Sequence, residues 1–421
     1  MAHALPRPLV AAIKLLAAIP ALPVLVLLAL VQRAVSVARR RRGLRPRLLW
    51  GPSPIISIKY WSAAMRTLGY WSATCVEDVY AIYSRADFDR LRADFGPRGA
   101  WFEPWRDFLV FAWALRRADV LLMFFHGGFL HNTALHWFEL PLLHLAGKRV
   151  VVSPYGSDIA VPGHLGVWEQ AMLADYPDTA ARAPQVRRRV DHLSRHADVI
   201  IRNVNPGYQP RWDVLWPNQF AIDVDAWAPA GDKGRADGRD GEVVVVHAPN
   251  HRTLKGTAHV IAAVDALTAE GLNVRLELLE RRPNHEVRAA LHGADILAEQ
   301  FLAAYAMLAV EGLASGTPVL AHLSFLPPAL LEHPVVRECP IIDASIETLT
   351  DELRRLVTDP ELRLRLGRQS REFAVRHHSY AALGAVWAEI VEAAWAGRRP
   401  PVIAGSAPAA APAAAPGSAA R

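Results

Sequence analysis

The chain has 421 residues, of which 52% are apolar and 13 are tryptophan, a composition that excludes a disordered protein and a length that accommodates two medium-sized domains. The formal net charge is +6, but nine of the 47 lysines and arginines lie in residues 1–47, which contain no acidic residue. The remaining 38 basic and 41 acidic residues give a nearly balanced body, so the charge does not indicate a nucleic-acid-binding protein.

The N-terminal segment is predicted to attach the protein to a membrane. Residues 9–31 are apolar apart from Lys14, and the four arginines 39–42 follow them. About 20 apolar residues suffice to cross a bilayer, and arginines stay on the cytoplasmic side. We therefore expect residues 1–47 to form an uncleaved anchor on an anionic membrane surface, with the body on the cytoplasmic face of the inner membrane. Because Pro20 and Pro23 interrupt the segment, a helix lying in the interface is the alternative.

From Pro54 onward, short apolar runs alternate with helical patterns. Such alternation predicts a parallel, doubly wound α/β sheet. A helix is expected over residues 60–68, ending at Gly69. Strands are expected at 55–58, 72–76, 120–125, 149–153 and 199–202.

A Gly-rich, charged segment over residues 231–241 predicts a linker between two α/β domains, covering residues 48–230 and 242–396. The second domain opens with an apolar run at 243–247, predicted as a buried strand, and a helix is expected over 257–269. The Ala/Pro-rich tail, residues 397–421, is expected to be disordered.

The loop between that strand and that helix is predicted to bind a phosphorylated ligand. It carries Arg252, Lys255 and Gly256 immediately before a helix start at Thr257. Backbone amides and the helix dipole favour an anion at such a position, and two cations add to this. Two solvated loop cations are the alternative.

Two motifs carry a resemblance to a known family. The Arg252-x-x-Lys-Gly256 loop and the block Glu311-Gly-Leu-Ala-Ser-Gly-Thr-Pro-Val319 are similar to those of GT-B glycosyltransferases of family 4. The resemblance implies two facing Rossmann-like domains that transfer a sugar from a UDP- or GDP-linked donor to a glycan or lipid-linked acceptor. It also implies retention of configuration, no cofactor and no metal. Arg252, Lys255 and Gly256 would bind the diphosphate, and Glu311 the ribose hydroxyls.

The chain departs from the family pattern at one position. The family has a second glutamate eight residues before Glu311, where this chain has Ala303. That glutamate normally contacts the transferred sugar, so its replacement leaves the sugar undefined. Glu299 and Gln300 are the nearby candidates to substitute for it.

Two residues of the first domain follow predicted strands and are expected to face the acceptor. His126 comes after the strand at 120–125, and Asp158 comes after the strand at 149–153. Ligands of such sheets bind beyond the carboxyl ends of strands. The resemblance gives His126 a role in contacting the donor sugar or orienting the acceptor hydroxyl, while a structural histidine and a capping aspartate are the alternatives.

No metal site is predicted. Asp223-Val-Asp225 has the spacing of a metal motif but lacks a third ligand nearby, and it resembles the connection before the second domain in family 4. His377 and His378 are expected at the surface. Two alternative functions stay open. In these alternatives the chain is either a catalytically silent relative that binds nucleotide or glycan as a partner subunit, or a nucleotide-sugar epimerase on the same fold.

Overall fold

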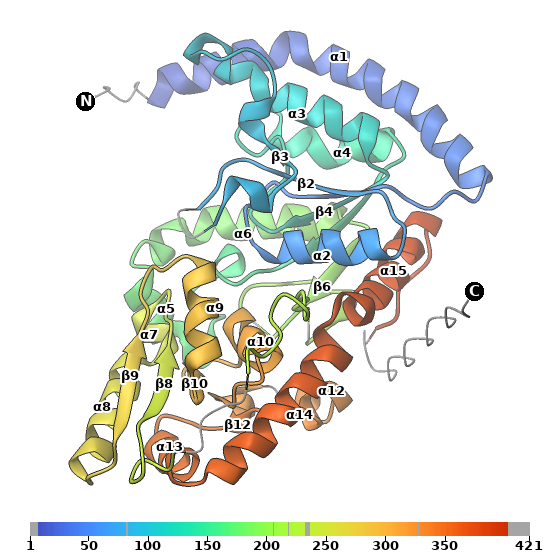
Figure 1. The fold of residues 1–421 in the computed structure, drawn as a ribbon. Helices are drawn as coiled ribbons and strands as arrows, with labels where there is room; N and C mark the ends of the chain where they lie inside the picture. Colours follow the sequence, from blue (N-terminus) through green and yellow to red (C-terminus); the bar gives the residue numbers. More distant parts are fainter. Residues whose placement is uncertain are drawn as a thin grey trace, which may run out of the picture.

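The computed structural model describes residues 7–80, 83–204, 206–217, 219–231, 236–326 and 328–402. Two parallel β-sheets, one in each half of the molecule, are each covered by helices (Figure 1). Within the predicted linker only residues 231 and 236–241 fall in these ranges, and most of the predicted tail, residues 403–421, lies outside them.

The sheet of the N-terminal half has the strand order β3-β2-β1-β4-β5-β6-β7 in the part of the chain that the structure describes, and its pairs are parallel. Every side chain of β4 is buried, as expected for a strand covered on both faces. The strands are β1 (Leu48–Trp50), β2 (Ser72–Val76), β3 (Arg90–Leu91), β4 (Val120–Phe124), β5 (Arg149–Ser153), β6 (Val199–Arg202) and β7 (Val214–Leu215).

The helices of this half cover both faces of its sheet (Figure 1). They are α1 (Arg7–Arg41), α2 (Ser57–Thr67), α3 (Glu103–Arg117), α4 (Glu139–Leu145), α5 (Glu169–Asp175) and α6 (Thr179–His196).

The prediction of a strand at 55–58 is wrong, whereas the other strands predicted here are confirmed. Residues 48–50 form the strand instead, paired between β2 and β4, and Ser57 already begins α2. A three-residue strand is too short to show a hydrophobic period in the sequence. Ile55 and Ile56 are apolar because they pack against the aromatic core and not because they belong to a strand.

The second sheet has the order β12-β11-β10-β8-β9, again with parallel pairs among the described strands. Its strands are β8 (Val243–His247), β9 (Val274–Leu278), β10 (Ile296–Gln300), β11 (Val319–Ala321) and β12 (Ile342–Asp343). Its helices are α7 (Arg252–Lys255), α8 (Thr257–Ala269), α9 (Asn284–Gly293), α10 (Met307–Ala314), α11 (Pro328–Leu331), α12 (Pro334–Arg337), α13 (Leu349–Thr358) and α14 (Pro360–His378).

The last helix, α15 (Tyr380–Ala396), was expected with the second domain but packs against the first. It lies on α2, and the ring of Trp387 meets those of Trp50, Trp61 and Trp216 at centroid distances of 4.9, 5.1 and 5.0 Å. The core of the N-terminal half is therefore completed by the C-terminal end of the described chain (Figure 1).

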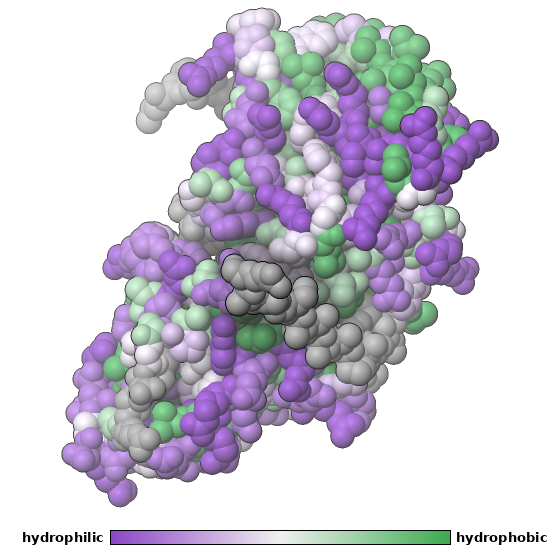
Figure 2. All heavy atoms as spheres, turned by 45° about the vertical axis from the view of Figure 1, so that its right-hand side comes forward, coloured by the Kyte–Doolittle hydropathy of each residue, from purple (hydrophilic) through white to green (hydrophobic). Residues whose placement is uncertain are grey.

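Helix α1 lies along α3 and α4 instead of standing apart from the body (Figure 1). It is long and apolar enough to cross a membrane, and it bows over the domain, with two prolines in its interior. One face is a buried stripe of small side chains with one leucine, comprising Ala17, Ala18, Ala21, Leu25 and Ala29. The opposite face exposes large apolar side chains, including Leu16 at 67% and Leu27 at 65%. Figure 2 shows apolar side chains gathered at this upper end of the molecule.

The end of α1 is fixed to the domain by a buried aspartate. The fully buried carboxylate of Asp119 accepts hydrogen bonds from Nε of Arg39 at 2.9 Å and Nε of Arg47 at 3.0 Å, with Nζ of Lys148 3.7 Å away. Arg39 and Arg47 belong to the predicted polybasic segment. They are part of the folded body, so the expectation that residues 1–47 form a separate anchor does not hold for them.

Candidate functional site

The carboxyl ends of the two sheets face one another. Leu165 and Trp168, which follow β5, share an apolar cluster with Leu254, which follows β8, and Ala303, which follows β10. Ala303, which stands where the resembled family has a glutamate, is thus buried in a contact between the halves, where a carboxylate would lack water.

The predicted phosphate loop is a short helix rather than an open loop. Residues Arg252–Lys255 form α7, and Gly256 separates it from α8 with φ of 73°. This left-handed conformation favours glycine, and a Cβ at Gly256 would also lie 3.4 Å from Cβ of Phe301. The glycine therefore allows the backbone to turn sharply beside the end of β10.

The two predicted phosphate-binding cations point in different directions. The Lys255 ammonium is buried, donates to Oε1 of Gln300 at 2.6 Å and forms an ion pair with Glu299. Arg252 is exposed and donates to both carboxylate oxygens of Glu280 at 3.0 Å. Lys255 alone therefore reaches the buried side of the site.

The carboxylate of Glu299 joins this lysine to the start of α10. It accepts a hydrogen bond of 3.2 Å from the amide of Ala306, the residue before α10. Burial raises the pKa of Glu299 above its ordinary value, while the Lys255 ammonium offsets part of that rise. Glu299 thus occupies the position between a cation and a helix start where an anion is stabilised.

Glu311 is buried in α10. Its Oε1 accepts a hydrogen bond of 2.9 Å from Nδ2 of Asn284. Burial raises the pKa of Glu311 to about 7 in spite of this bond. Burial and the nearby Glu311 carboxylate also raise the pKa of Tyr60 in α2, so Glu311 lies near the N-terminal half.

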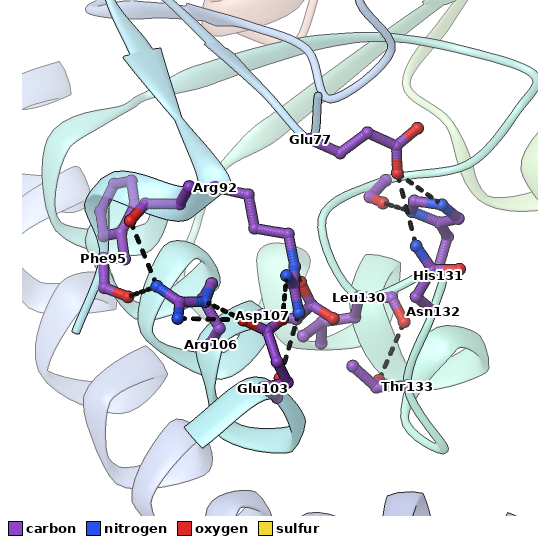
Figure 3. Close-up of polar contacts among 12 residues, drawn as sticks. Glu77, Arg92, Phe95, Glu103, Arg106, Asp107, Leu130, His131, Asn132 and Thr133 are labelled. Carbon is purple, nitrogen blue, oxygen red and sulfur yellow. Dashed lines mark hydrogen bonds and ion pairs between the residues drawn. The ribbon is translucent and has the colours of Figure 1, made fainter. Parts of the chain in front are cut away.

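His126 lies just beyond β4, beside an ion pair that the sequence analysis missed. Its Nε2 is 4.0 Å from Oε1 of Glu77, the residue after β2. Oε2 of Glu77 is in turn 3.1 Å from Nε2 of His131 (Figure 3). Nδ1 of His131 also lies 2.7 Å from the carbonyl oxygen of Gly128. The rule that located His126, the carboxyl end of a strand, applies equally to Glu77 and would have found it.

The three titratable groups of this cluster differ in charge. Burial lowers the pKa of His126 to about 4, with a contribution from His131, so His126 is neutral at neutral pH. Burial also acts to lower the pKa of His131, but the bonds to Glu77 and Gly128 outweigh it and raise that pKa. The Glu77–His131 ion pair therefore stands beside a neutral imidazole.

Asp158 is fully buried between its own loop and the loop after β4. Its Oδ1 accepts hydrogen bonds from the amides of Tyr155 at 3.0 Å and Gly156 at 2.9 Å, and its Oδ2 accepts one from the amide of Phe125 at 3.0 Å. Burial raises its pKa to about 6 despite these amides. Asp158 joins the ends of β4 and β5, which suits a positioning residue.

One cluster among the described residues could hold a metal ion. Donor atoms of Glu77, His126 and His131 lie within 4.8 Å of one another, and two imidazoles with a carboxylate form a ligand set that transition metals accept. At Asp223-Val-Asp225, by contrast, Oδ1 of Asp223 accepts the amide of Asp225 at 3.2 Å, and the Asp225 side chain is 97% exposed.

The expectation that His378 lies at the surface is wrong. It is buried where α14 ends, with Nδ1 2.6 Å from the carbonyl oxygen of Phe220. Burial lowers its pKa to about 4, so the neutral ring serves as a structural contact between α14 and the connection that precedes the second domain.

The two halves are also joined by hydrogen bonds that the sequence did not indicate. Asp175, the last residue of α5, accepts hydrogen bonds from the amides of Thr253 at 3.4 Å and Leu254 at 2.9 Å. The hydroxyl of the adjacent Tyr176 is hydrogen-bonded to Nε2 of His251. These contacts connect the N-terminal half directly to α7.

Comparisons with known proteins agree with this architecture. No protein-family model matches the chain. A segment of 118 residues is 36% identical to the D-inositol 3-phosphate glycosyltransferase of Corynebacterium glutamicum, and a segment of 115 residues is 34% identical to that of Corynebacterium efficiens. Each match covers 27% of this chain and about a quarter of the relative, 27% and 26% respectively.

A solved structure gives the fold over most of the chain. An α-glucosyltransferase in complex with UDP and a 13-mer DNA superposes with a TM-score of 0.50 at 13% identity, covering 83% of this chain and 100% of that one. Together with the two parallel sheets, this likeness identifies the fold as GT-B, with two Rossmann-like domains.

Proposed function

We propose that this chain is a glycosyltransferase that moves a sugar from a UDP- or GDP-linked donor to a glycan or lipid-linked acceptor. The observation that carries the proposal is the burial of Lys255 and Glu311 beyond the carboxyl ends of the adjacent strands β8 and β10. Nucleotides bind at this end of such sheets. The partial sequence match to sugar-transferring enzymes supports the same activity.

Lys255 stabilises the leaving diphosphate in this proposal. An ammonium group has three donors, and Glu299 and Gln300 accept from Lys255, which leaves one donor for a phosphate oxygen. As the bond between sugar and phosphate breaks, negative charge grows on the diphosphate, and a positioned cation lowers the energy of that state. Gly256 brings backbone amides close, and Arg252 reaches the phosphates only after leaving Glu280.

Glu311 holds the ribose, and His126 faces the acceptor. A carboxylate can accept hydrogen bonds from two neighbouring ribose hydroxyls at once, which suits an ionised Glu311. A neutral His126 can accept a hydrogen bond from the attacking hydroxyl at neutral pH. Asp158 keeps His126 in place through the amide of Phe125. We further propose that the anomeric configuration is retained and that no metal is required.

The proposed location is the cytoplasmic face of the membrane. The exposed apolar face of α1 and the exposed Arg41 and Arg42 at its end supply two attachment signals for an anionic bilayer. Because the opposite face of α1 packs on α3 and α4, we propose that α1 lies in the membrane interface with the domain attached.

A catalytically silent relative is the second candidate, and two observations favour it. Ala303 stands where the family's sugar-binding glutamate is found, and Glu299 already neutralises Lys255. Such a protein would bind a nucleotide without releasing nucleoside diphosphate from a nucleotide sugar.

The deciding experiment uses full-length protein in detergent with a panel of UDP- and GDP-sugars and a membrane lipid extract. Calorimetry measures nucleotide binding, and release of nucleoside diphosphate measures turnover. We expect both in the wild type and neither in the Glu311→Ala variant. Binding without release from any donor would support the silent relative, and absence of binding would contradict both functions.

A further inference from the structure

A cavity of about 750 Å³ lies between the start of α1, the loop after β4 and helix α6. Gly127 and Gly128 line it, and a Cβ at either position would clash, at 2.7 Å from Cβ of His131 and at 2.1 Å from Oε1 of Glu139 respectively. The backbone thus forms part of the cavity wall next to His126, which also lines it. This is the acceptor side of the proposed site.

The side chains that line the cavity are strongly biased towards positive charge. Lys14 comes from α1, and Arg188 and Arg189 come from α6. Four imidazoles add further hydrogen-bonding groups, those of His126, His131, His136 and His192.

Fewer acidic groups than cations lie at the cavity, and the Glu77 carboxylate beside it is already paired with His131. Glu139 is the one acid among the lining residues. It is buried, and its two oxygens accept hydrogen bonds from the amides of Phe129 at 2.6 Å and Leu130 at 2.8 Å. Its carboxylate is therefore hydrogen-bonded to the backbone and not to the arginines.

Arg189 is held in the wall with unused hydrogen-bonding capacity. Its Nη2 donates to the carbonyl oxygen of Asp158 at 3.4 Å, a long bond, and its buried Nε donates to no acceptor among the described residues. Nε2 of His192 is likewise buried without a hydrogen-bond partner in the described structure. A partly desolvated guanidinium of this kind is stabilised when an oxyanion supplies the missing acceptor.

We propose that this cavity binds an anionic group of the acceptor, a phosphate monoester or diester, between Lys14, Arg188 and Arg189. The proposal rests on the proposed transferase function and adds the chemical class of its acceptor. The phosphate anchors the acceptor, and its hydroxyl then reaches His126 on the same wall. The exposed Trp137 also lines the cavity, so the opening carries an apolar group beside the lipid-facing helix.

The test measures anion binding in the absence of a nucleotide sugar. Calorimetry with glycerol 3-phosphate, and with glycerol as the uncharged control, is carried out on the wild type, Lys14→Gln and the double variant Arg188→Gln/Arg189→Gln. Arg195→Gln is the matched control, because Arg195 is an exposed arginine of α6 that does not line the cavity. Each lost charge-assisted contact should weaken binding by roughly tenfold.

The source of the phosphate is distinguished with vesicles of phosphatidylcholine, with and without phosphatidic acid. Cavity-dependent binding of glycerol 3-phosphate indicates a soluble phosphorylated acceptor, whereas cavity-dependent binding to phosphatidic acid alone indicates a lipid headgroup. Equal affinity in the wild type and the double variant for both probes would overturn the proposal, as would no binding of either probe.

Two controls separate this proposal from folding and from the donor site. Arg189→Lys keeps the charge and should retain most of the affinity, and the thermal unfolding of every variant is compared with the wild type. UDP and GDP binding is measured in parallel and should be unchanged in the cavity variants. If the wild type does not bind UDP or GDP, the transferase proposal is contradicted. If the wild type binds a nucleotide but neither phosphate probe, only the cavity proposal is contradicted.

Discussion

The carboxylate of Asp175 accepts a hydrogen bond of 2.9 Å from the backbone amide of Leu254. A residue of the N-terminal half thereby caps the first turn of α7 in the other half, next to Lys255. Any motion that separates the halves at this point must break this bond, and with it the bond between Tyr176 and His251. The predicted phosphate segment is therefore coupled to the relative position of the domains.

Asp175→Ala should expose the amides of α7. Loss of a side-chain cap costs about 1 kcal/mol, so exchange of the Thr253 and Leu254 amides should accelerate by roughly fivefold. Hydrogen–deuterium exchange followed by mass spectrometry measures the exchange rates of these amides. Asp178→Ala is the control, since the exposed Asp178 makes no capping bond at the start of α6. Identical protection in both variants would show that the contact does not hold the halves together.

Lys255→Ala should reduce both turnover and stability. Turnover should fall by about a hundredfold, the scale of a lost electrostatic contact to the transition state. The buried Glu299 would lose its partner, which costs roughly 3–5 kcal/mol, as measured by chemical denaturation. Adding Glu299→Gln should restore much of the stability but not the turnover. If the single variant is as stable as the wild type, the ion pair contributes nothing to the fold.

Arg252→Ala should behave differently, because Arg252 and its partner Glu280 are exposed. The free energy of unfolding should change by less than about 1 kcal/mol. A drop in turnover comparable with that of Lys255→Ala would show that Arg252 leaves Glu280 and binds the diphosphate. Unchanged turnover would remove Arg252 from the site.

Nucleotide affinity should increase as pH rises through about 7. Below this pKa Glu311 is protonated and can accept less from the ribose, whereas above it the carboxylate accepts two hydrogen bonds. Calorimetry with the nucleoside diphosphate, about one pH unit on either side of the pKa, tests the sign. Glu311→Gln should bind more weakly and remove this step. A step that persists in Glu311→Gln must come from another group.

The two faces of α1 should respond in opposite ways to substitution. Leu16→Ser with Leu27→Ser removes up to about 2 kcal/mol of membrane affinity per side chain, so the protein should sediment less with anionic vesicles while its thermal unfolding stays the same. Ala29→Leu on the buried face should overpack the contact with α3 and α4 and cost about 1–3 kcal/mol of stability. Salt-sensitive release of the wild type would show that charge alone attaches it.

The sequence located most strands because their apolar runs are continuous. Strand ends and motifs singled out Lys255 and Glu311, both of which are buried, while their roles stay predictions. It could not pair Lys255 with Glu299, because the two are 44 residues apart and meet only through the adjacency of β8 and β10. The expectation that Lys255 stands on a loop is corrected by its place in α7 and its burial.

The same limit applies to α1. An apolar segment of 23 residues has the same composition whether lipid surrounds it or one of its faces packs on protein. Only the small residues, such as Ala21 and Ala29, mark the face that packs on protein. Deletion of residues 1–47, the segment predicted as an anchor, would also remove Arg39 and Arg47, the partners of Asp119. Such a deletion is therefore expected to destabilise the domain.

The return of α15 to the first half means that the polypeptide passes between the halves twice. A rotation of one half against the other must bend the backbone both near residues 219–231 and near Ser379. The hinge therefore consists of two chain segments, which define its axis. A fragment ending before Tyr380 would leave Trp50 and Trp61 in contact with water. Supplying residues 380–402 as a separate peptide should rescue that fragment, as in a split protein reassembled from its pieces.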